Sequence, residues 1–227
     1  MKKSPVYFLS TIIWLFASLA YAQPSEFELY VFAPTLDVQT SPESGQQPVG
    51  TLTYGDRVYA ATNTNDDDKT WINVRAETKA GHVEGYAHAE ALLPVPVPDI
   101  TKAGFASLTD QLTARGEPRG TKTDDTTTLS QTYHHGVTLV TRTFHTPYGD
   151  FSEQQISVSG ITVPQGFLLA RAIVNQDGLT SEHMARTSKM EIDETGNPFI
   201  FDDSHWQMIS VGQTSDGVTI SFPERAD

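Results

Sequence analysis

A proline-rich segment near the middle of the chain restricts the fold more than any other feature of the sequence. Residues 92–99 read LLPVPVPD, in which prolines alternate with valine. Proline lacks an amide hydrogen and pushes the preceding residue toward extended conformations, so this segment cannot be helical. This segment predicts a Pro-rich linker at 94–99 between a domain at 23–93 and a second domain at 100–227. The alternative is that the prolines form an edge segment that lies on the surface of one domain. We expect the two domains to fold independently.

The N-terminus has the pattern of a secretory signal peptide. Lys2 and Lys3 precede an apolar stretch over residues 6–19, and residues 20–22 (AYA) supply the small residues of a cleavage site. A retained membrane anchor is the alternative, because the apolar stretch is only slightly shorter than the ~20 residues of a spanning helix. The polar sequence that follows favours cleavage. We therefore expect residues 1–22 to be removed and the mature protein to be periplasmic or secreted.

The chain is acidic and contains no cysteine. Its formal charge of −13 becomes −15 when the two lysines of the signal peptide are removed. Such a surface repels the phosphates of nucleic acids, so we expect no nucleic-acid partner. Without cysteine an exported domain has no disulfides and must be stable through core burial alone. No later apolar stretch is long enough to cross a membrane, so no membrane span is expected after signal cleavage.

Short β-strand patterns with turn signals between them fill the first domain. The predicted strands cover residues 30–32, 36–38, 49–53, 57–61 and 71–75. Several short strands within about seventy residues favour a small barrel over an open sheet, because closure removes exposed sheet edges.

A set of residues at characteristic spacings runs through these strands. They are Leu36-Asp37-Val38-Gln39 with Pro42, Val49-Gly50-Thr51-Leu52, Gly55, Val58, Trp71, Val74 and Gly85-Tyr86. From about Leu29 to Leu93 the chain thereby resembles a bacterial SH3 (SH3b) domain, although Gln39 replaces the usual arginine and Ala87 the usual valine. The resemblance implies a small SH3-like β-barrel that binds peptides or cell-wall components. It also implies a turn or strand end at Gly85-Tyr86.

The second domain is predicted to be an α+β domain with a mainly antiparallel sheet, and it resembles no family that we recognise. Phe105, Leu108 and Leu112 lie at helical spacing and predict one amphipathic helix that ends at Gly116. Thr162 predicts the cap of a second helix with a proline in its first turn. Strands are predicted within 129–146, interrupted by a bend at His135-Gly136, and at 153–158. A hairpin is predicted at the end of the chain, with strands at 206–211 and 218–222 joined by a turn at 215–217.

Common catalytic signatures are absent from the sequence. Cysteine peptidases and L,D-transpeptidases need a cysteine nucleophile, and zinc peptidases need a motif such as H-E-x-x-H. The motifs G-x-S-x-G and S-x-x-K with its partners are also missing. We therefore expect no enzymatic activity and no cofactor. A cell-wall hydrolase of unrecognised type is the remaining enzymatic alternative.

Three polar clusters contain the residue types of metal sites. They are His82 with Glu84, His88 and Glu90; His134 with His135 and His145; and the loop from Asn63 to Asp68. The first would share one face of a straight strand, but the turn expected at Gly85-Tyr86 breaks that face. The second lies in neighbouring strand segments that could converge. The third lacks the glycine and the distal glutamate of an EF-hand. Solvated surface residues are the favoured interpretation for all three, so no metal site is predicted.

Aromatic residues beside an acidic loop predict a ligand site in the first domain. In SH3-like barrels such aromatic residues form shallow grooves for extended ligands. The acidic loop favours ligands with amines, such as a peptide stem with a free diamino-acid side chain. The predicted ligand-binding residues are Tyr54, Tyr59, Asp66, Asp67, Asp68 and Trp71.

These features together predict an exported, non-enzymatic binding protein whose SH3b-like module recognises a peptide or peptidoglycan component. The alternative from another class is a periplasmic inhibitor or immunity protein against a cell-wall hydrolase, because a small acidic protein can block a basic enzyme by charge complementarity. The expected partner is therefore a cell-wall peptide, peptidoglycan or an exported protein.

Overall fold

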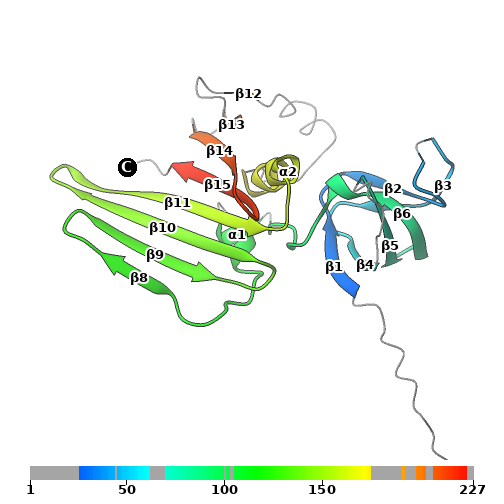
Figure 1. The fold of residues 1–227 in the computed structure, drawn as a ribbon, viewed down its shortest axis with the longest axis horizontal. Helices are drawn as coiled ribbons and strands as arrows, with labels where there is room; N and C mark the ends of the chain where they lie inside the picture. Colours follow the sequence, from blue (N-terminus) through cyan, green and yellow to red (C-terminus); the bar gives the residue numbers. More distant parts are fainter. Residues whose placement is uncertain are drawn as a thin grey trace, which may run out of the picture.

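The structure, a computed structural model, describes residues 26–43, 45–61, 70–99, 101–102, 105–174, 191–192, 198–202 and 207–223. The predicted signal peptide and the loop from Asn63 to Asp68 lie outside the described residues. The protein is mainly β and contains two antiparallel sheets, of which the first curls into a half-barrel (Figure 1). The predicted fold class, a β-rich SH3-like domain followed by an α+β domain, is confirmed at this level.

The first sheet contains seven strands that curl around their own core. In spatial order they are β3 (Pro48–Thr53), β2 (Thr35–Gln39), β6 (Gly81–His88), β5 (Trp71–Thr78), β4 (Arg57–Ala61), β1 (Glu26–Val31) and β7 (Leu92–Leu93), with a 3-10 turn η1 (Ala89–Ala91) before β7. Every second side chain points inward, as the period of a strand requires. Val31, Leu52, Val58 and Val74 are among the buried residues of this core. The strands predicted in this region are all present.

The segment around Gly85 is part of a strand, so the turn or strand end expected at Gly85-Tyr86 is wrong. β6 pairs with β5 from Gly81 to His88 without interruption. Gly85 is buried where β2 pairs with β6, and a Cβ atom on Gly85 would lie only 2.4 Å from the carbonyl oxygen of Gln39. The glycine is therefore required by the close approach of two strands.

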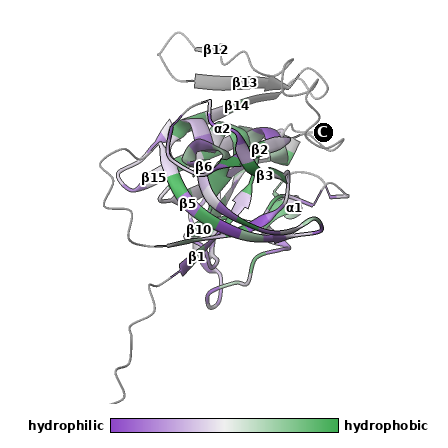
Figure 2. Cartoon of the chain, turned by 90° about the vertical axis from the view of Figure 1, so that its right-hand side faces the viewer, coloured by the Kyte–Doolittle hydropathy of each residue, from purple (hydrophilic) through white to green (hydrophobic). Residues whose placement is uncertain are grey.

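The second sheet contains eight strands and one long hairpin. In spatial order the strands are β12 (Glu191–Ile192), β13 (Pro198–Asp202), β14 (Gln207–Gln213), β15 (Gly217–Pro223), β11 (Gly149–Ser159), β10 (Val137–Thr146), β9 (Thr126–Thr132) and β8 (Arg119–Lys122). The predicted bend at His135-Gly136 and the predicted hairpin around residues 215–217 are both present. Hydrophobic and hydrophilic colours both occur along single strands (Figure 2), as expected where one side is buried.

Helix α2 (Val163–Val174) packs on β14 and β15 and begins where the sequence predicts (Figure 1). The backbone N–H of Gln165 donates to Thr162 Oγ1 over 3.5 Å, and the backbone N–H of Thr162 donates to Gln165 Oε1 over 2.9 Å. This reciprocal pair is a capping box, which satisfies amides that the helix itself leaves unpaired. In the described part of the chain, none of the helices has both the length and the apolar character needed to cross a bilayer.

The other predicted helix is much shorter than expected. Helix α1 covers only Ala106–Thr109, so the prediction of a helix extending to Gly116 is wrong. The backbone N–H of Arg115 donates to the carbonyl of Thr132 over 2.7 Å, at the end of β9. The residues after α1 are therefore drawn into pairing with the second sheet, and this tertiary pairing overrides the local helical pattern.

The proline-rich segment connects the two sheets and is packed against them. Val95 is fully buried and Pro98 is also buried. Phe32, Leu93 and Val95 belong to the same core cluster as the buried side chains of α1, α2 and the second sheet. We call this cluster the shared core. Its contacts cross between the two halves and favour one cooperative unit over the two independently folding domains expected from the sequence.

Candidate binding site

Tyr59 and Trp71, two of the predicted ligand-binding residues, lie on the outer side of the first sheet. Side chains at every second position of β4, β5 and β6 point away from the core there. Across the strand pairs, Trp71 lies opposite His88, Asn73 opposite Tyr86, Arg75 opposite both Glu84 and Tyr59, and Glu77 opposite His82. We call these residues the outer face.

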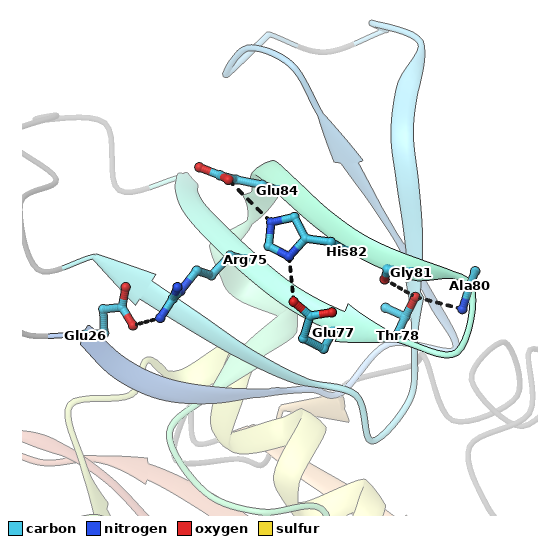
Figure 3. Close-up of polar contacts among 8 residues, drawn as sticks. All are labelled: Glu26, Arg75, Glu77, Thr78, Ala80, Gly81, His82 and Glu84. Atoms are coloured by element: carbon cyan, nitrogen blue, oxygen red, sulfur yellow. Dashed lines mark hydrogen bonds and ion pairs between the residues drawn. The ribbon is translucent and has the colours of Figure 1, made fainter.

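Two cations lie over the ring of Tyr59. The guanidinium carbons of Arg57 and Arg75 lie 5.8 and 5.7 Å from the centre of the ring, within the range of cation–π contacts. Arg57 pairs with Glu28 over 3.4 Å, and Arg75 pairs with Glu26 (Figure 3). These ion pairs are partly exposed and add little stability. They do position the two guanidinium groups, which in turn position the ring of Tyr59.

A hollow of about 150 Å³ lies beside this ring, lined by Tyr59, Arg75, Ala76, Glu77 and His82. The Arg75 and Glu77 side chains are 52% and 80% exposed, and they stand two residues apart on β5. The hollow therefore presents a cation and a carboxylate to solvent next to an aromatic ring.

His82 is held by two carboxylates at the edge of this hollow (Figure 3). Its Nδ1 atom lies 2.8 Å from Glu77 and its Nε2 atom 3.5 Å from Glu84. Hydrogen bonds to Glu77 and then Glu84 favour the imidazolium and raise the pKa of His82 above its ordinary value. Because this pKa is raised in the folded state, the stabilisation is present below the unfolded pKa and is lost as the pH rises through the folded pKa.

We expect Glu77→Gln to lower the pKa of His82 toward the ordinary histidine value, because it removes the larger of the two carboxylate contacts. An NMR titration of the His82 ring resonances measures the midpoint directly. Glu90→Gln, a neighbouring carboxylate outside the pair, is the matched control and should leave the midpoint in place. A midpoint that Glu77→Gln does not move would contradict the assigned cause.

Trp71 lies at the other end of the outer face and is half-buried. Its ring meets that of His88 edge to face, with the ring centres 5.1 Å apart. The side chain is therefore supported on one side by a neighbouring strand and is open on another. Arg75 lies four residues after Trp71 on β5, so these two side chains of the outer face are roughly 13 Å apart along the strand.

Tyr54 does not share the face of Tyr59 and Trp71. Its ring contacts Phe32 edge to face, with ring centres 5.9 Å apart, and it packs against the shared core. Burial raises the pKa of Tyr54. The other predicted ligand-binding residues, Asp66 to Asp68, lie outside the described residues. Of the predicted set, the structure thus brings Tyr59 and Trp71 onto one face and places Tyr54 elsewhere.

The predicted histidine clusters have two different outcomes. His82, Glu84 and His88 do share one face, because β6 continues through Gly85, whereas Glu90 lies in η1. Within the described ranges, no group of three or more histidine, aspartate or glutamate side chains is placed to hold a metal ion.

The second cluster does not converge. His135 lies in the bend before β10 and has a positive φ of 62°, whereas His145 lies near the opposite end of β10. His145 Nε2 is 2.9 Å from Thr127 Oγ1, and its Nδ1 is 3.1 Å from Asp150. These contacts fix the ring of His145 on the hairpin, far along the strand from His135.

A cleft between the two sheets was not predicted from the sequence. It has a volume of about 480 Å³ and is lined by Phe27, Leu29, Ile72, Ala89, Leu92, Pro94, His135, Gly136, Ser159, Gly160 and Gln165. Gln165 crosses from α2 and donates to the carbonyls of Ala89 and Leu92 over 3.1 and 2.7 Å. The lining comes from segments far apart in the chain, and the bend at His135-Gly136 was its only local sequence signal.

The structure agrees with the SH3b resemblance in showing a curled antiparallel sheet at residues 29–93. A curled sheet is shared by many folds, so the family assignment of this region stays a prediction from its motifs. Comparison of the chain with protein-family models, with curated proteins and with solved structures finds no match.

Proposed function

We propose that the protein is an exported, non-enzymatic binding protein whose first domain recognises a peptide or peptidoglycan component through the outer face. The observation that carries this proposal is the hollow beside Tyr59, where exposed Arg75 and Glu77 present opposite charges next to a fixed aromatic ring. Convergent polar groups beside an aromatic surface are typical of binding sites.

The charges of the outer face favour a ligand with both an amine and a carboxylate. Glu77 and Glu84 offer carboxylate oxygens to an amine, and Arg75 offers a guanidinium to a carboxylate. Wall stem peptides with a free diamino-acid side chain carry both groups. The distance from Trp71 to Arg75 along β5, roughly 13 Å, matches about four residues of an extended peptide.

The site of action follows from the N-terminal sequence. The basic residues, apolar stretch and AYA site support export, with a mature N-terminus at Gln23. An exported protein that binds stem peptides meets its ligand in the cell envelope. N-terminal sequencing of the protein recovered from the envelope tests this step, and recovery of intact Met1 in a membrane fraction would overturn it.

We expect Trp71→Ala and Tyr59→Ala each to weaken binding of a synthetic stem peptide by about 2 kcal/mol, roughly thirtyfold, because each removes an aromatic contact. Isothermal titration of the mature chain with that peptide measures the change. Tyr148→Ala is the matched control, since Tyr148 is fully exposed at the tip of the β10–β11 hairpin. A thermal melt of each variant separates lost binding from lost stability.

Three outcomes would overturn the proposal. If the wild-type protein does not bind the stem peptide at millimolar concentration, the outer face is not a stem-peptide site. Release of fragments from peptidoglycan, abolished by His135→Ala or His145→Ala, would identify a hydrolase instead. Capture of a single basic enzyme from an envelope extract, without binding of wall fragments, would favour the inhibitor or immunity alternative.

A further inference from the structure

One side of the second sheet lies opposite the shared core and has an unusual composition. The core side carries Val137, Ile156, Val158, Val211 and Ile220, which pack with α2. On the opposite side, strand pairing aligns two neighbouring rows of residues. The rows are Gly212, Thr219, Ser157, Thr138 and Thr132, and Ser210, Ser221, Gln155, Val140 and Ser130. We call these two rows the hydroxyl face.

The ten residues of these two rows include no charged residue, although the chain as a whole carries a formal charge of −13. Beyond β9 the second row meets Arg119 of β8, which lies opposite Ser130. Its side chains are mostly hydroxyls, each of which can donate and accept hydrogen bonds. The hydroxyl oxygens of Ser157 and Thr219 lie 3.0 Å apart, and the side-chain amide of Gln155 donates to the hydroxyl of Ser221 over 2.9 Å. The strands space these groups regularly, at about 4.8 Å across the sheet and about 7 Å along each strand.

A hollow of about 220 Å³ interrupts this face over β11, β14 and β15. It is lined by Gln155, Ser210, Val211, Gly212, Thr219 and Ser221. Gly212 leaves space because it has no side chain, and a Cβ atom there would meet only the carbonyl oxygen of Thr219, at 4.0 Å.

An aromatic pair lies on the same side of the sheet, toward the tip of the β10–β11 hairpin. The rings of Phe144 and Phe151 are stacked with their centres 4.8 Å apart, and Phe151 is 41% exposed. Arg142 and Glu153, which form an ion pair over 3.3 Å, separate this pair from the hydroxyl face. The side therefore combines a hydrogen-bonding array with an exposed apolar ring.

We propose that the hydroxyl face binds an uncharged polysaccharide. Sugar hydroxyls pair with groups that both donate and accept, and the C–H faces of sugar rings pack on aromatic rings. A nucleic acid would require clustered cations, and an amphipathic helix would require an apolar surface; the two rows supply neither. Charge complementarity thus selects a neutral glycan. This site is separate from the outer face and goes beyond the proposed function, adding a glycan ligand to a peptide ligand.

The test uses the mature chain and two uncharged probes, N-acetylglucosamine hexamer and cellohexaose. We expect the wild-type protein to bind at least one of them in isothermal titration. Gly212→Phe fills the hollow and should weaken binding at least tenfold. Gly212→Ala is the matched control and should bind like the wild type, since the site has room for a Cβ atom.

A second pair of variants keeps the proposal testable if Gly212→Phe fails to fold. Thr219→Val and Ser157→Ala each remove one hydroxyl and should weaken binding about fivefold. Thr141→Val, the same chemical change on the other side of the sheet, should leave binding unchanged. Absence of binding to both probes at millimolar concentration, or equal weakening by Thr141→Val, would overturn the proposal. Trp71→Ala should leave glycan binding intact, which separates this test from that of the outer face.

Discussion

Replacing Phe32 with alanine should lower the free energy of unfolding by about 3–5 kcal/mol, the usual cost of removing a large buried aromatic side chain. Phe32 is fully buried, although it follows β1 in the first half of the chain. It belongs to the shared core together with Leu93, Val95 and the interior of the second sheet. The cavity left by Phe32→Ala therefore removes contacts on which both sheets depend.

We expect this loss to affect both sheets in one transition. Residues 23–227 contain two tryptophans, Trp71 in β5 and Trp206, which precedes β14 in the sequence. Urea unfolding is followed by tryptophan fluorescence in two parents, with and without Phe32→Ala. The Trp206→Phe parent keeps Trp71 as the probe of the first half, and the Trp71→Phe parent keeps Trp206 as the probe of the second half. Coincident midpoints that shift together would support one cooperative unit. A shift confined to the Trp71 signal would instead support the two independent domains expected from the sequence.

Phe27→Ala is the matched control for this experiment. Phe27 lies in β1 and its side chain is 38% exposed at the cleft between the sheets. Its removal leaves no closed cavity, so we expect a loss of about 1 kcal/mol, much smaller than that of Phe32→Ala. Equal losses for the two variants would contradict the placement of Phe32 in the shared core.

Replacing Gly85 with alanine should cost about 3 kcal/mol of stability, because the paired strand β2 lies in close contact with this position. The added Cβ atom would meet the carbonyl oxygen of Gln39 at 2.4 Å and a methyl group of Val38 at 3.0 Å. A backbone oxygen cannot rotate away as the end of a flexible side chain can, so β2 and β6 must separate.

The midpoint of urea unfolding measures the effect of Gly85→Ala, with Gly212→Ala as the control. Gly212 is also in a strand, but its added Cβ atom would have ordinary contact distances. We expect the control to stay within about 0.5 kcal/mol of the wild type. If Gly85→Ala were equally well tolerated, the contact between β2 and β6 would be looser than the structure shows.

Local features of the sequence were sufficient to predict most of the strands and one helix. Alternating apolar residues place β2, β3 and β4 correctly because every second side chain of a strand must face the core. Thr162 and Gln165 mark the start of α2, since a capping box needs only residues within one turn. The bend at His135-Gly136 is also local, because both residues have positive φ.

Contacts between distant segments decided the remaining features. Gly85 reads as a turn residue in isolation, yet it is a strand residue because β6 pairs with β5 on one side and with β2 on the other. The residues after α1 have a helical pattern, yet pairing with the end of β9 ends the helix early. Val95 and Pro98 read as a spacer, yet they are buried because both sheets pack against them.

The candidate sites likewise depend partly on local sequence features and partly on contacts between distant segments. The sequence by itself determined that Tyr59 and Trp71 belong to strands of an acidic chain without cysteine. Strand register, which depends on partners far along the chain, placed Arg75 and Glu77 beside Tyr59. Contact with Phe32 places Tyr54, in the turn after β3, against the shared core. Register also aligned the hydroxyls of β9, β10, β11, β14 and β15 into one face. Only the tertiary structure decides such groupings, because the residues that meet across strands have no fixed spacing in sequence.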